Sequence, residues 1–278
     1  MTEPAIHNFN HHAMATHFQV RIANEERTYA AQTAQAAFTL LDQLETHLSR
    51  FRANSDIVQL TQLVPGEKLR VSEPVLACLA LAKKMDAATG GAFSVTAAAM
   101  QSQPAQPAWS VVENEFSIRC DRGKLEFDLG AIGKGFALDR LAEVLREWEC
   151  PAFLLVAGGS SVLAGDAPTA TPGWSCGLGD DGSLKRYWLK NVSVSGSGLA
   201  IKGRHILDPR TGLPSALRNR VWALADSAAE SDAISTAAMI LPEPEIAELV
   251  SRRDDWLVFL SENENWRQLG KRPSPPPA

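Results

Sequence analysis

A carboxylate and two hydroxyls lie at helical spacing in the segment SDAISTAA. Asp232 and Thr236 are four residues apart, and Ser235 lies between them. In a helix, Asp232 and Thr236 therefore share a face, and Ser235 is adjacent. Such oxygens are hard ligands that suit Mg²⁺, which usually keeps waters or substrate phosphates in its other positions. The structural alternative is that the hydroxyls bond back to helix carbonyls while Asp232 is solvated, and the segment taken alone favours it.

A second segment, DLGAIGKG, places Gly130, Gly133 and Gly135 around Lys134. We expect it to join a strand to a helix. Glycine lets backbone amides approach a phosphate, and a helix N-terminus favours an anion. The spacing matches neither a Walker loop nor the dinucleotide pattern GxGxxG. The alternative is a tight turn between a strand and a helix, with Lys134 exposed.

The third segment, RHILDPRTGLP, brings His205, Asp208 and Arg210 within six residues. Asp208 precedes a proline, which holds it out of the α region, and its carboxylate can cap the turn. An imidazole titrates near neutrality and a carboxylate can orient it, so His205 or Asp208 is a candidate proton acceptor. Alternatively, DPRTG is only a well-formed β-turn.

The spacing of apolar residues predicts the elements that hold these segments. We expect helices over 30–48, 73–88, 136–149 and 227–241, with Ser72 as the N-cap of the second, and a short Pro-bounded helix after the last. Strands are expected over 17–22, 125–130, 152–157 and 256–260, with short runs between 188 and 194. Strands and helices do not alternate regularly, which indicates an α+β fold. The domain should cover 1–265, and the Pro-rich tail, 266–278, should be disordered.

Composition excludes several classes of function. The chain has 278 residues, 45% of them hydrophobic and 21% charged, with a net charge of −5. It lacks the broad basic surface that nucleic acid requires, so we expect no nucleic-acid partner. No apolar run reaches the roughly 20 residues that cross a bilayer, and the start lacks a signal peptide. We therefore expect no membrane insertion and a cytoplasmic location, unless a leader is missing. The four cysteines form no CxxC pair and indicate buried or idle thiols.

Together the three segments resemble the ApbE family, the FAD:protein FMN transferases. The pattern DLGxIxKGxxxD matches 128–139, HIxDPxTG matches 205–212, and DAxxT matches 232–236. Weaker similarities occur in the family's order at 14–16, 48–57 and 91–96. The resemblance implies an ApbE-like (T-fold-like) α+β fold, a single domain of two closely packed lobes.

Carried over by position, the resemblance also implies roles for individual residues. FAD would contact Met14, Ala92, Phe93, Ser94, Asp128, Lys134 and Ile206. The metal would be held by the Ala131 carbonyl, Asp232 and Thr236, with Ser235 as a further candidate. The catalytic residues would be His205, Asp208 and Lys134. This chain has Ala15, Ser94, Ser160 and Val194 where the family pattern commonly has Gly, Asp, Asp and Thr.

The implied reaction is the Mg²⁺-dependent transfer of FMN from FAD to a threonine hydroxyl of an acceptor protein, with release of AMP. Such chemistry depends on alignment and on neutralising charge on phosphate oxygens, and here Lys134 would screen part of that charge. One alternative is a Mg²⁺-dependent FAD pyrophosphatase that yields FMN and AMP. A second is a non-catalytic protein that binds or delivers FAD, and a third is a structural protein without a ligand.

Overall fold

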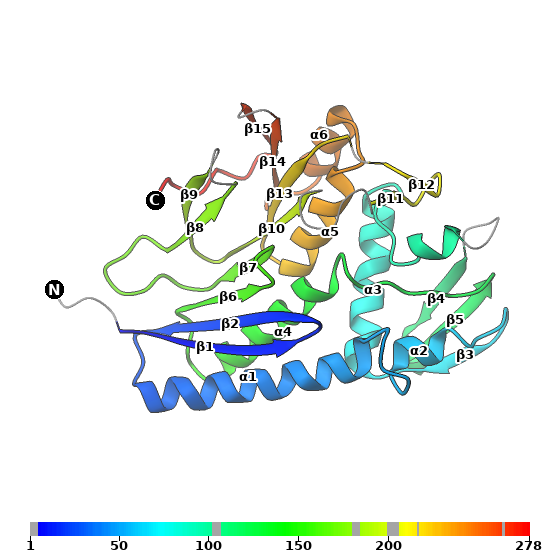
Figure 1. The fold of residues 1–278 in the computed structure, drawn as a ribbon, viewed down its shortest axis with the longest axis horizontal. Helices are drawn as coiled ribbons and strands as arrows, with labels where there is room; N and C mark the ends of the chain where they lie inside the picture. The colour runs from blue at the N-terminus through cyan, green and yellow to red at the C-terminus, as the bar shows by residue number, and fades with distance from the viewer. Residues whose placement is uncertain (1–4, 102–106, 180–183, 199–205, 216, 263–264) are drawn as a thin grey trace.

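An eight-stranded antiparallel sheet, ordered β1-β2-β6-β7-β10-β13-β14-β15, forms the largest part of the fold (Figure 1). The computed structural model describes residues 5–101, 107–179, 184–198, 206–215, 217–262 and 265–278. The strands of the sheet are β1 (Ile6–Ala13), β2 (Thr16–Ala23), β6 (Phe153–Ala157), β7 (Ser161–Ala164), β10 (Val192–Gly198), β13 (Arg220–Ala225), β14 (Leu257–Glu262) and β15 (Asn265–Leu269). This order brings β7 directly beside β10.

Three helices cover one face of the sheet: α1 (Arg27–Leu48), α4 (Gly133–Glu147) and α5 (Ala228–Ala238). Helix α1 packs on β1, α4 on β6 and β7, and α5 on β10 and β13 (Figure 1). The buried apolar residues of α1 recur at helical spacing: Ala30, Ala34, Ala37, Phe38, Leu41, Leu44 and Leu48. This apolar stripe joins the inner face of the sheet in the main hydrophobic core.

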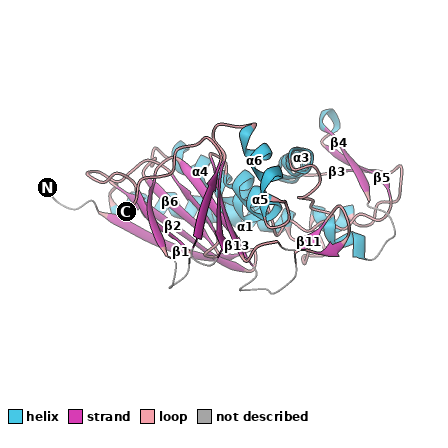
Figure 2. Ribbon diagram, turned by 90° about the horizontal axis from the view of Figure 1, so that it is seen from above, coloured by secondary structure: helices cyan, strands magenta, loops and turns pink. Residues whose placement is uncertain are grey.

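The hairpin of β8 (Trp174–Leu178) and β9 (Lys185–Leu189) packs on the opposite face and closes a second hydrophobic core. Away from the large sheet lies a smaller one, ordered β3-β5-β4, formed by β3 (Lys68–Arg70), β4 (Ala108–Val112) and β5 (Ser117–Arg122). Helix α3 (Glu73–Ala88) stands between the two sheets (Figures 1 and 2). The remaining short elements are α2 (Asp56–Leu60), α6 (Glu243–Ser251), the 3₁₀ turns η1 (Ala97–Gln101) and η2 (Glu113–Glu115), and the pair β11 (Leu207–Asp208) and β12 (Leu213–Pro214).

The expected mixture of helices and strands in a single domain is confirmed, and each predicted helix is present with small shifts at its ends. Ser72 does precede α3, but its side chain makes no capping hydrogen bond. Among the described residues, no helix is both long and apolar enough to cross a membrane. All four cysteines are free thiols, and burial raises the pKa of Cys78 to about 12.

Two sequence predictions of local structure are wrong. Residues 125–130, predicted as a strand, are extended but lie in no sheet. The backbone amide of Asp128 instead donates to the carbonyl of Val95, at 2.7 Å, which joins two distant segments. The C-terminal residues, expected to be a disordered tail, begin with the rest of β15 and end against β9. There the Pro276 carbonyl accepts a hydrogen bond from the Trp188 amide at 2.8 Å. This is possible because proline lacks a backbone N–H but keeps its carbonyl oxygen as an acceptor.

Candidate active site

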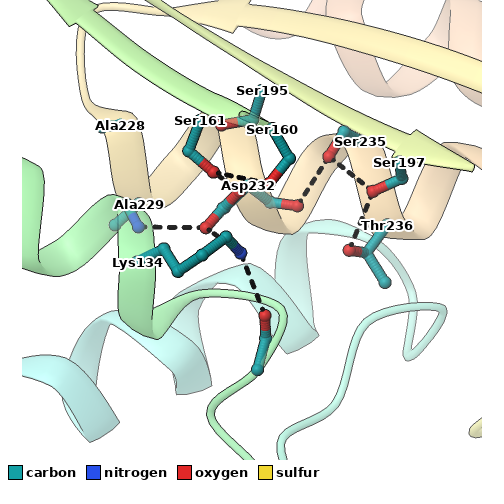
Figure 3. A network of polar contacts seen from close by, with 12 residues as sticks. Lys134, Ser160, Ser161, Ser195, Ser197, Ala228, Ala229, Asp232, Ser235 and Thr236 are labelled. Atoms are coloured by element: carbon teal, nitrogen blue, oxygen red, sulfur yellow. Dashed lines mark hydrogen bonds and ion pairs between the residues drawn. The ribbon is translucent and has the colours of Figure 1, made fainter. Parts of the chain in front are cut away.

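Asp232 lies at the centre of a polar network between α4, α5 and the sheet (Figure 3). Its residue is only 4% exposed. One carboxylate oxygen, Oδ1, accepts a hydrogen bond from Ser161 Oγ at 2.7 Å, and the other, Oδ2, accepts from the Gly135 amide at 3.0 Å. Such donors are required, because a buried carboxylate without them would be strongly disfavoured. The sequence-predicted ligand is thus a buried, oriented anion.

The ammonium group of Lys134 lies beside this carboxylate. Its Nζ is 3.4 Å from Asp232 Oδ2 and 3.3 Å from the Gly130 carbonyl oxygen. The Lys134 side chain is 23% exposed. The geometry therefore brings the glycine-rich turn and α5 together, as the sequence predicted, and it places a positive charge between two oxygen acceptors.

Thr236 and Ser235 follow Asp232 along α5 and face β10. Ser197 Oγ of β10 is 2.9 Å from Ser235 Oγ and 3.4 Å from Thr236 Oγ1 (Figure 3). Ser235 Oγ also donates to the Asp232 carbonyl at 2.9 Å, which is the helix back-bond considered as the structural alternative. The hydroxyl of Thr236 makes no such back-bond within the described hydrogen bonds, and it is therefore the better candidate ligand.

These residues fit a hard divalent cation. Within the described chain, no three His, Cys, Asp or Glu side chains are grouped to hold a metal, so a site here depends on one carboxylate with hydroxyl and carbonyl oxygens. That donor set is typical of Mg²⁺ sites, which rely on few protein ligands and on substrate phosphates. The Lys134 ammonium already contacts Asp232 Oδ2 and the Gly130 carbonyl oxygen, so these oxygens accept a positively charged group in the structure. Ala131, whose carbonyl was predicted as a ligand, follows Gly130 in the same turn.

The glycines of this turn have a different role from the one predicted. The Gly130 amide donates to Asp128 Oδ1, the Gly133 amide to the Leu129 carbonyl and the Gly135 amide to Asp232. None of these three amides is left for a phosphate. A Cβ atom at Gly135 would lie 2.6 Å from the Ala229 amide nitrogen, and closer still to the Ala228 carbonyl. Gly135 therefore permits close contact between α4 and the start of α5.

Asp139, the last residue of the glycine-rich motif, strengthens this contact. Its carboxylate accepts hydrogen bonds from Ser227 Oγ and from the amides of Ala228 and Ala229, at 2.7, 2.7 and 3.0 Å. It thus caps the N-terminus of α5, where a negative charge is favourable. Burial nevertheless raises the pKa of Asp139 above its usual value, against the opposing effect of these hydrogen bonds. The motif fixes the position of α5, and with it Asp232.

Asp128 lines a cavity of about 190 Å³ together with Arg50 and Phe127. Arg50 Nη1 donates to Asp128 Oδ2 at 2.8 Å. The neighbouring ring of Phe51 is 79% exposed and lies 4.8 Å from the Arg50 guanidinium carbon. Arg50 and Phe51 belong to a segment that the sequence placed in the family pattern without assigning either a role.

Residues 92–94 pack under the same region. Ala92 and Phe93 are each 1% exposed, so neither residue presents accessible surface to a ligand in this structure. Ser94 is half-buried, and its Oγ is 3.1 Å from Thr96 Oγ1. The hydrogen bond from Asp128 to Val95 attaches this segment to the glycine-rich turn. The two predicted FAD-contacting segments therefore adjoin each other.

Met14 occupies the turn between β1 and β2. Met14 and Ala15 both have positive φ angles, 50° and 56°. The Met14 amide donates to Glu45 Oε1 of α1 at 2.8 Å. The turn is therefore held in place by α1. Ala15 adopts a left-handed conformation that normally favours glycine, which is the residue that the family pattern has at this position.

Asp208 forms a compact ion pair within its own turn. Its Oδ1 accepts from the Arg210 amide and Nε, and its Oδ2 accepts from Nη2, each at 2.9 Å. The hydrogen bonds from Arg210 lower the pKa of Asp208 below its usual value. Arg210 also reaches Glu245 of α6 at 3.3 Å. This geometry matches the β-turn alternative. Ile206 immediately precedes β11, whereas His205 lies outside the described residues.

Three residues of the network were not found from the sequence: Arg50, Ser161 and Ser197. Each of the three lies far in the chain from the residue that it contacts, and strand pairing or loop packing brings the two together. Ser161 follows the Gly158-Gly159 turn that ends β6, and Ser197 lies in the run VSVSGSG. That alternation of serine with small or apolar residues was the one available signal of a hydroxyl-bearing strand face.

The chain matches known proteins over most of its length. The model of the ApbE family matches residues 14–260. The FAD:protein FMN transferase of Escherichia coli (strain K12) is 22% identical over 291 residues, which cover 90% of this chain and 82% of that protein. That of Treponema pallidum (strain Nichols) is 24% identical over 256 residues, covering 74% and 70%.

The fold is also found among solved structures. The apo form of the Pseudomonas stutzeri flavinyl transferase ApbE has a TM-score of 0.81 at 20% identity, covering 96% of this chain and 95% of that one. The apbe protein from Thermotoga maritima has a TM-score of 0.81 at 18% identity, covering 95% and 97%. At these identities the likeness establishes a shared fold.

Proposed function

Because this chain belongs to the ApbE family, we propose that it transfers the FMN part of FAD to a threonine hydroxyl of an acceptor protein, in a Mg²⁺-dependent reaction that releases AMP. The relatives are named FAD:protein FMN transferases. The observation that carries the proposal to this chain is the buried carboxylate of Asp232, held by Gly135 and Ser161 and adjoining Lys134.

In the proposed reaction, the threonine oxygen forms a bond to the phosphorus of the FMN half, and the bond from that phosphorus to the bridging oxygen breaks. AMP leaves with that oxygen, and the threonine proton passes to a base. Mg²⁺ held by Asp232, Thr236 and the Ala131 carbonyl would supply Lewis-acid charge next to the phosphate oxygens. Ser235 remains a further candidate for that set.

Lys134 provides the positive side chain of this site. Its ammonium already lies at the open edge of the network, so a short movement away from Asp232 would allow it to contact a phosphate. The three glycine amides of the turn are bonded within the protein, so the neutralisation of the phosphate charge would fall to the cation and to side chains. We therefore assign Lys134 the electrostatic role, in agreement with the expectation that phosphoryl transfer depends on such neutralisation.

The proton acceptor is assigned to His205. Asp208 is the weaker base, because Arg210 occupies both of its carboxylate oxygens and lowers its pKa. We propose that Asp208 instead holds the turn that follows Ile206. On the FAD side, the surface formed by Met14, Ser94 and Asp128 would receive the cofactor, and the buried residues Ala92 and Phe93 would support it.

The test is to incubate the purified protein with FAD, Mg²⁺ and an acceptor domain known to carry a threonine-linked flavin. AMP is measured by chromatography and bound flavin by in-gel fluorescence. Asp232→Asn should reduce AMP formation roughly 100-fold or more, since a ligating carboxylate supplies several kcal/mol of charge stabilisation. The matched control is Asp226→Asn, which changes an exposed aspartate just before α5 and should leave turnover unchanged.

Three outcomes separate the candidate functions. AMP together with protein-bound flavin supports the transferase. AMP together with free FMN, at the same rate with or without the acceptor, would identify the pyrophosphatase instead. Bound FAD without any AMP would identify a binding or delivery protein. Full activity of Asp232→Asn would show that Asp232 of α5 is not part of the catalytic site.

A further inference from the structure

Serine side chains form a layer between α5 and the neighbouring strands β7 and β10. Ser193, Ser195 and Ser197 alternate along β10 and therefore share the face that meets α5. Ser161 begins the adjacent strand, β7. Five of the serines are fully buried: Ser161, Ser193, Ser195, Ser231 and Ser235. Buried hydroxyls need partners, and here each finds one in another element.

The contacts of this layer divide into two groups. In the first group, Ser193 and Ser195 contact Ser231, at 2.7 and 2.9 Å, and Ser231 donates to the Ala228 carbonyl. In the second group, Ser161 contacts Asp232 and Ser197 contacts Thr236, the two side chains proposed to hold the metal (Figure 3). Only the second group reaches the functional site.

Ser161 determines how the carboxylate of Asp232 is turned. The terminal torsion of an aspartate has a broad preference, so the rotamer alone does not fix its oxygens. The bond from Ser161 to Oδ1 and the bond from Gly135 to Oδ2 fix both. The lone pairs of Oδ2 that remain then face Lys134, on the open side of the network.

Ser197 has the corresponding position beside Thr236. A threonine in a helix divides between two rotamers, because its hydroxyl can bond back to the preceding turn. Ser197 Oγ, at 3.4 Å from Thr236 Oγ1 and 2.9 Å from Ser235 Oγ, gives these hydroxyls a partner on the strand side. It therefore favours the rotamer that keeps the Thr236 hydroxyl beside β10.

We propose that Ser161 and Ser197 are positioning residues, whose hydroxyls on β7 and β10 orient the Asp232 carboxylate and the Thr236 hydroxyl for binding a divalent cation. This inference rests on the metal-dependent part of the proposed function. Residues that hold metal ligands in place generally contribute 10–100-fold to metal affinity or activity. We expect a loss of about that size when either hydroxyl is removed.

The test measures binding of Mn²⁺, which accepts the same oxygen ligands as Mg²⁺. Free Mn²⁺ is followed by electron paramagnetic resonance, with and without FAD, in the wild type and in Ser161→Ala, Ser197→Ala and Ser193→Ala. The third variant is the matched control, since it removes an equally buried hydroxyl whose hydrogen bond, among the described residues, goes to Ser231. Thermal denaturation of each variant reports on folding.

Support requires that Ser161→Ala and Ser197→Ala weaken Mn²⁺ binding about 10–100-fold while Ser193→Ala does not, and that Ser197→Thr restores it. If Ser161→Ala does not fold, Mn²⁺ binding by Ser197→Ala still tests the inference, because Ser197 is only half-buried. Wild-type affinity in both variants, or an equal loss in Ser193→Ala, would overturn the inference alone. Absence of Mn²⁺ binding by the wild type with FAD would overturn the inference together with the metal dependence proposed for the reaction.

Discussion

Gly135→Ala should be strongly destabilising, because the close contact between α4 and α5 leaves no room for a side chain. The new Cβ would lie 2.6 Å from the Ala229 amide nitrogen and nearer still to the Ala228 carbonyl. Carbon atoms pack at about 3.5–4.0 Å, so the helices would have to separate by on the order of 1 Å. Overpacking generally costs about 1–3 kcal/mol. Since backbone is the obstacle here, we expect the upper end of that range.

The greater helix propensity of alanine offsets at most about 1 kcal/mol of this cost. The net loss of about 2–3 kcal/mol should lower the melting temperature by roughly 4–10 °C in a chain of this size, measured by differential scanning calorimetry. The control is Gly133→Ala in the same turn, whose Cβ would lie 3.4 Å from Leu129 Cβ, an acceptable contact. Equal melting temperatures for the two variants would refute the role assigned to Gly135.

Two further predictions concern stability. Ala15→Gly should raise the melting temperature slightly, because a left-handed φ of 56° costs about 1–2 kcal/mol with a Cβ, while the entropy of glycine offsets about 0.5–1 kcal/mol. Ala13→Gly, in β1, is the control and should lower it. Asp208→Asn should lower the melting temperature at pH 7 by a few degrees. Arg210 lowers the pKa of Asp208 in the folded state below the usual 3.8. The stabilisation that the ionised Asp208 provides is therefore fully present above pH 3.8, and it is lost as the pH falls through the folded-state pKa. Melting curves from pH 7 to about pH 2 test this, because they cover the range below 3.8 in which the difference should disappear. A pH-independent difference would contradict it.

The helices were predictable because local periodicity determines them. In α1, which was predicted over 30–48, the apolar residues that recur at helical spacing are buried in the core. In α5, the spacing of Asp232 and Thr236 correctly indicated a shared face, since helical geometry depends only on separation in the chain. The predicted start of this helix, at Ser227, is its N-cap in the structure, where Ser227 Oγ accepts from the Glu230 amide.

Strands depended on information that the sequence does not display. β1 was not predicted, because the side chains that it turns toward α1 include His7 and His11 and therefore do not form an apolar alternation. His11 nevertheless stacks on Phe38, with ring centroids 4.9 Å apart. Conversely, 125–130 has a strand-like composition, but the Asp128 amide bonds to Val95 instead of to a neighbouring strand. Burial and pairing partners, more than intrinsic preference, decide whether such segments join a sheet.

The same distinction applies to the candidate site. The family pattern could point to Asp232, Thr236 and Lys134, because each lies in a short motif. It could not point to Ser161 or Ser197, because their importance comes from the pairing of β7 with β10 beneath α5. Pairing between strands with a hairpin inserted between them is a tertiary property, and a single sequence contains no direct record of it.

The glycine-rich turn shows how a correct motif can have an unexpected physical basis. It resembled a phosphate cradle, yet its amides bond to Asp128, to the Leu129 carbonyl and to Asp232. Two of those three acceptors are carboxylates, so the turn does bind anions, but they belong to the protein itself. Through Gly135 it brings the α4 N-terminus to Asp232, and one residue earlier it supplies Lys134 from the same helical turn. The motif therefore orients the buried carboxylate of Asp232. In the proposed reaction, the neutralisation of a bound phosphate would fall to a cation held by that carboxylate and to Lys134.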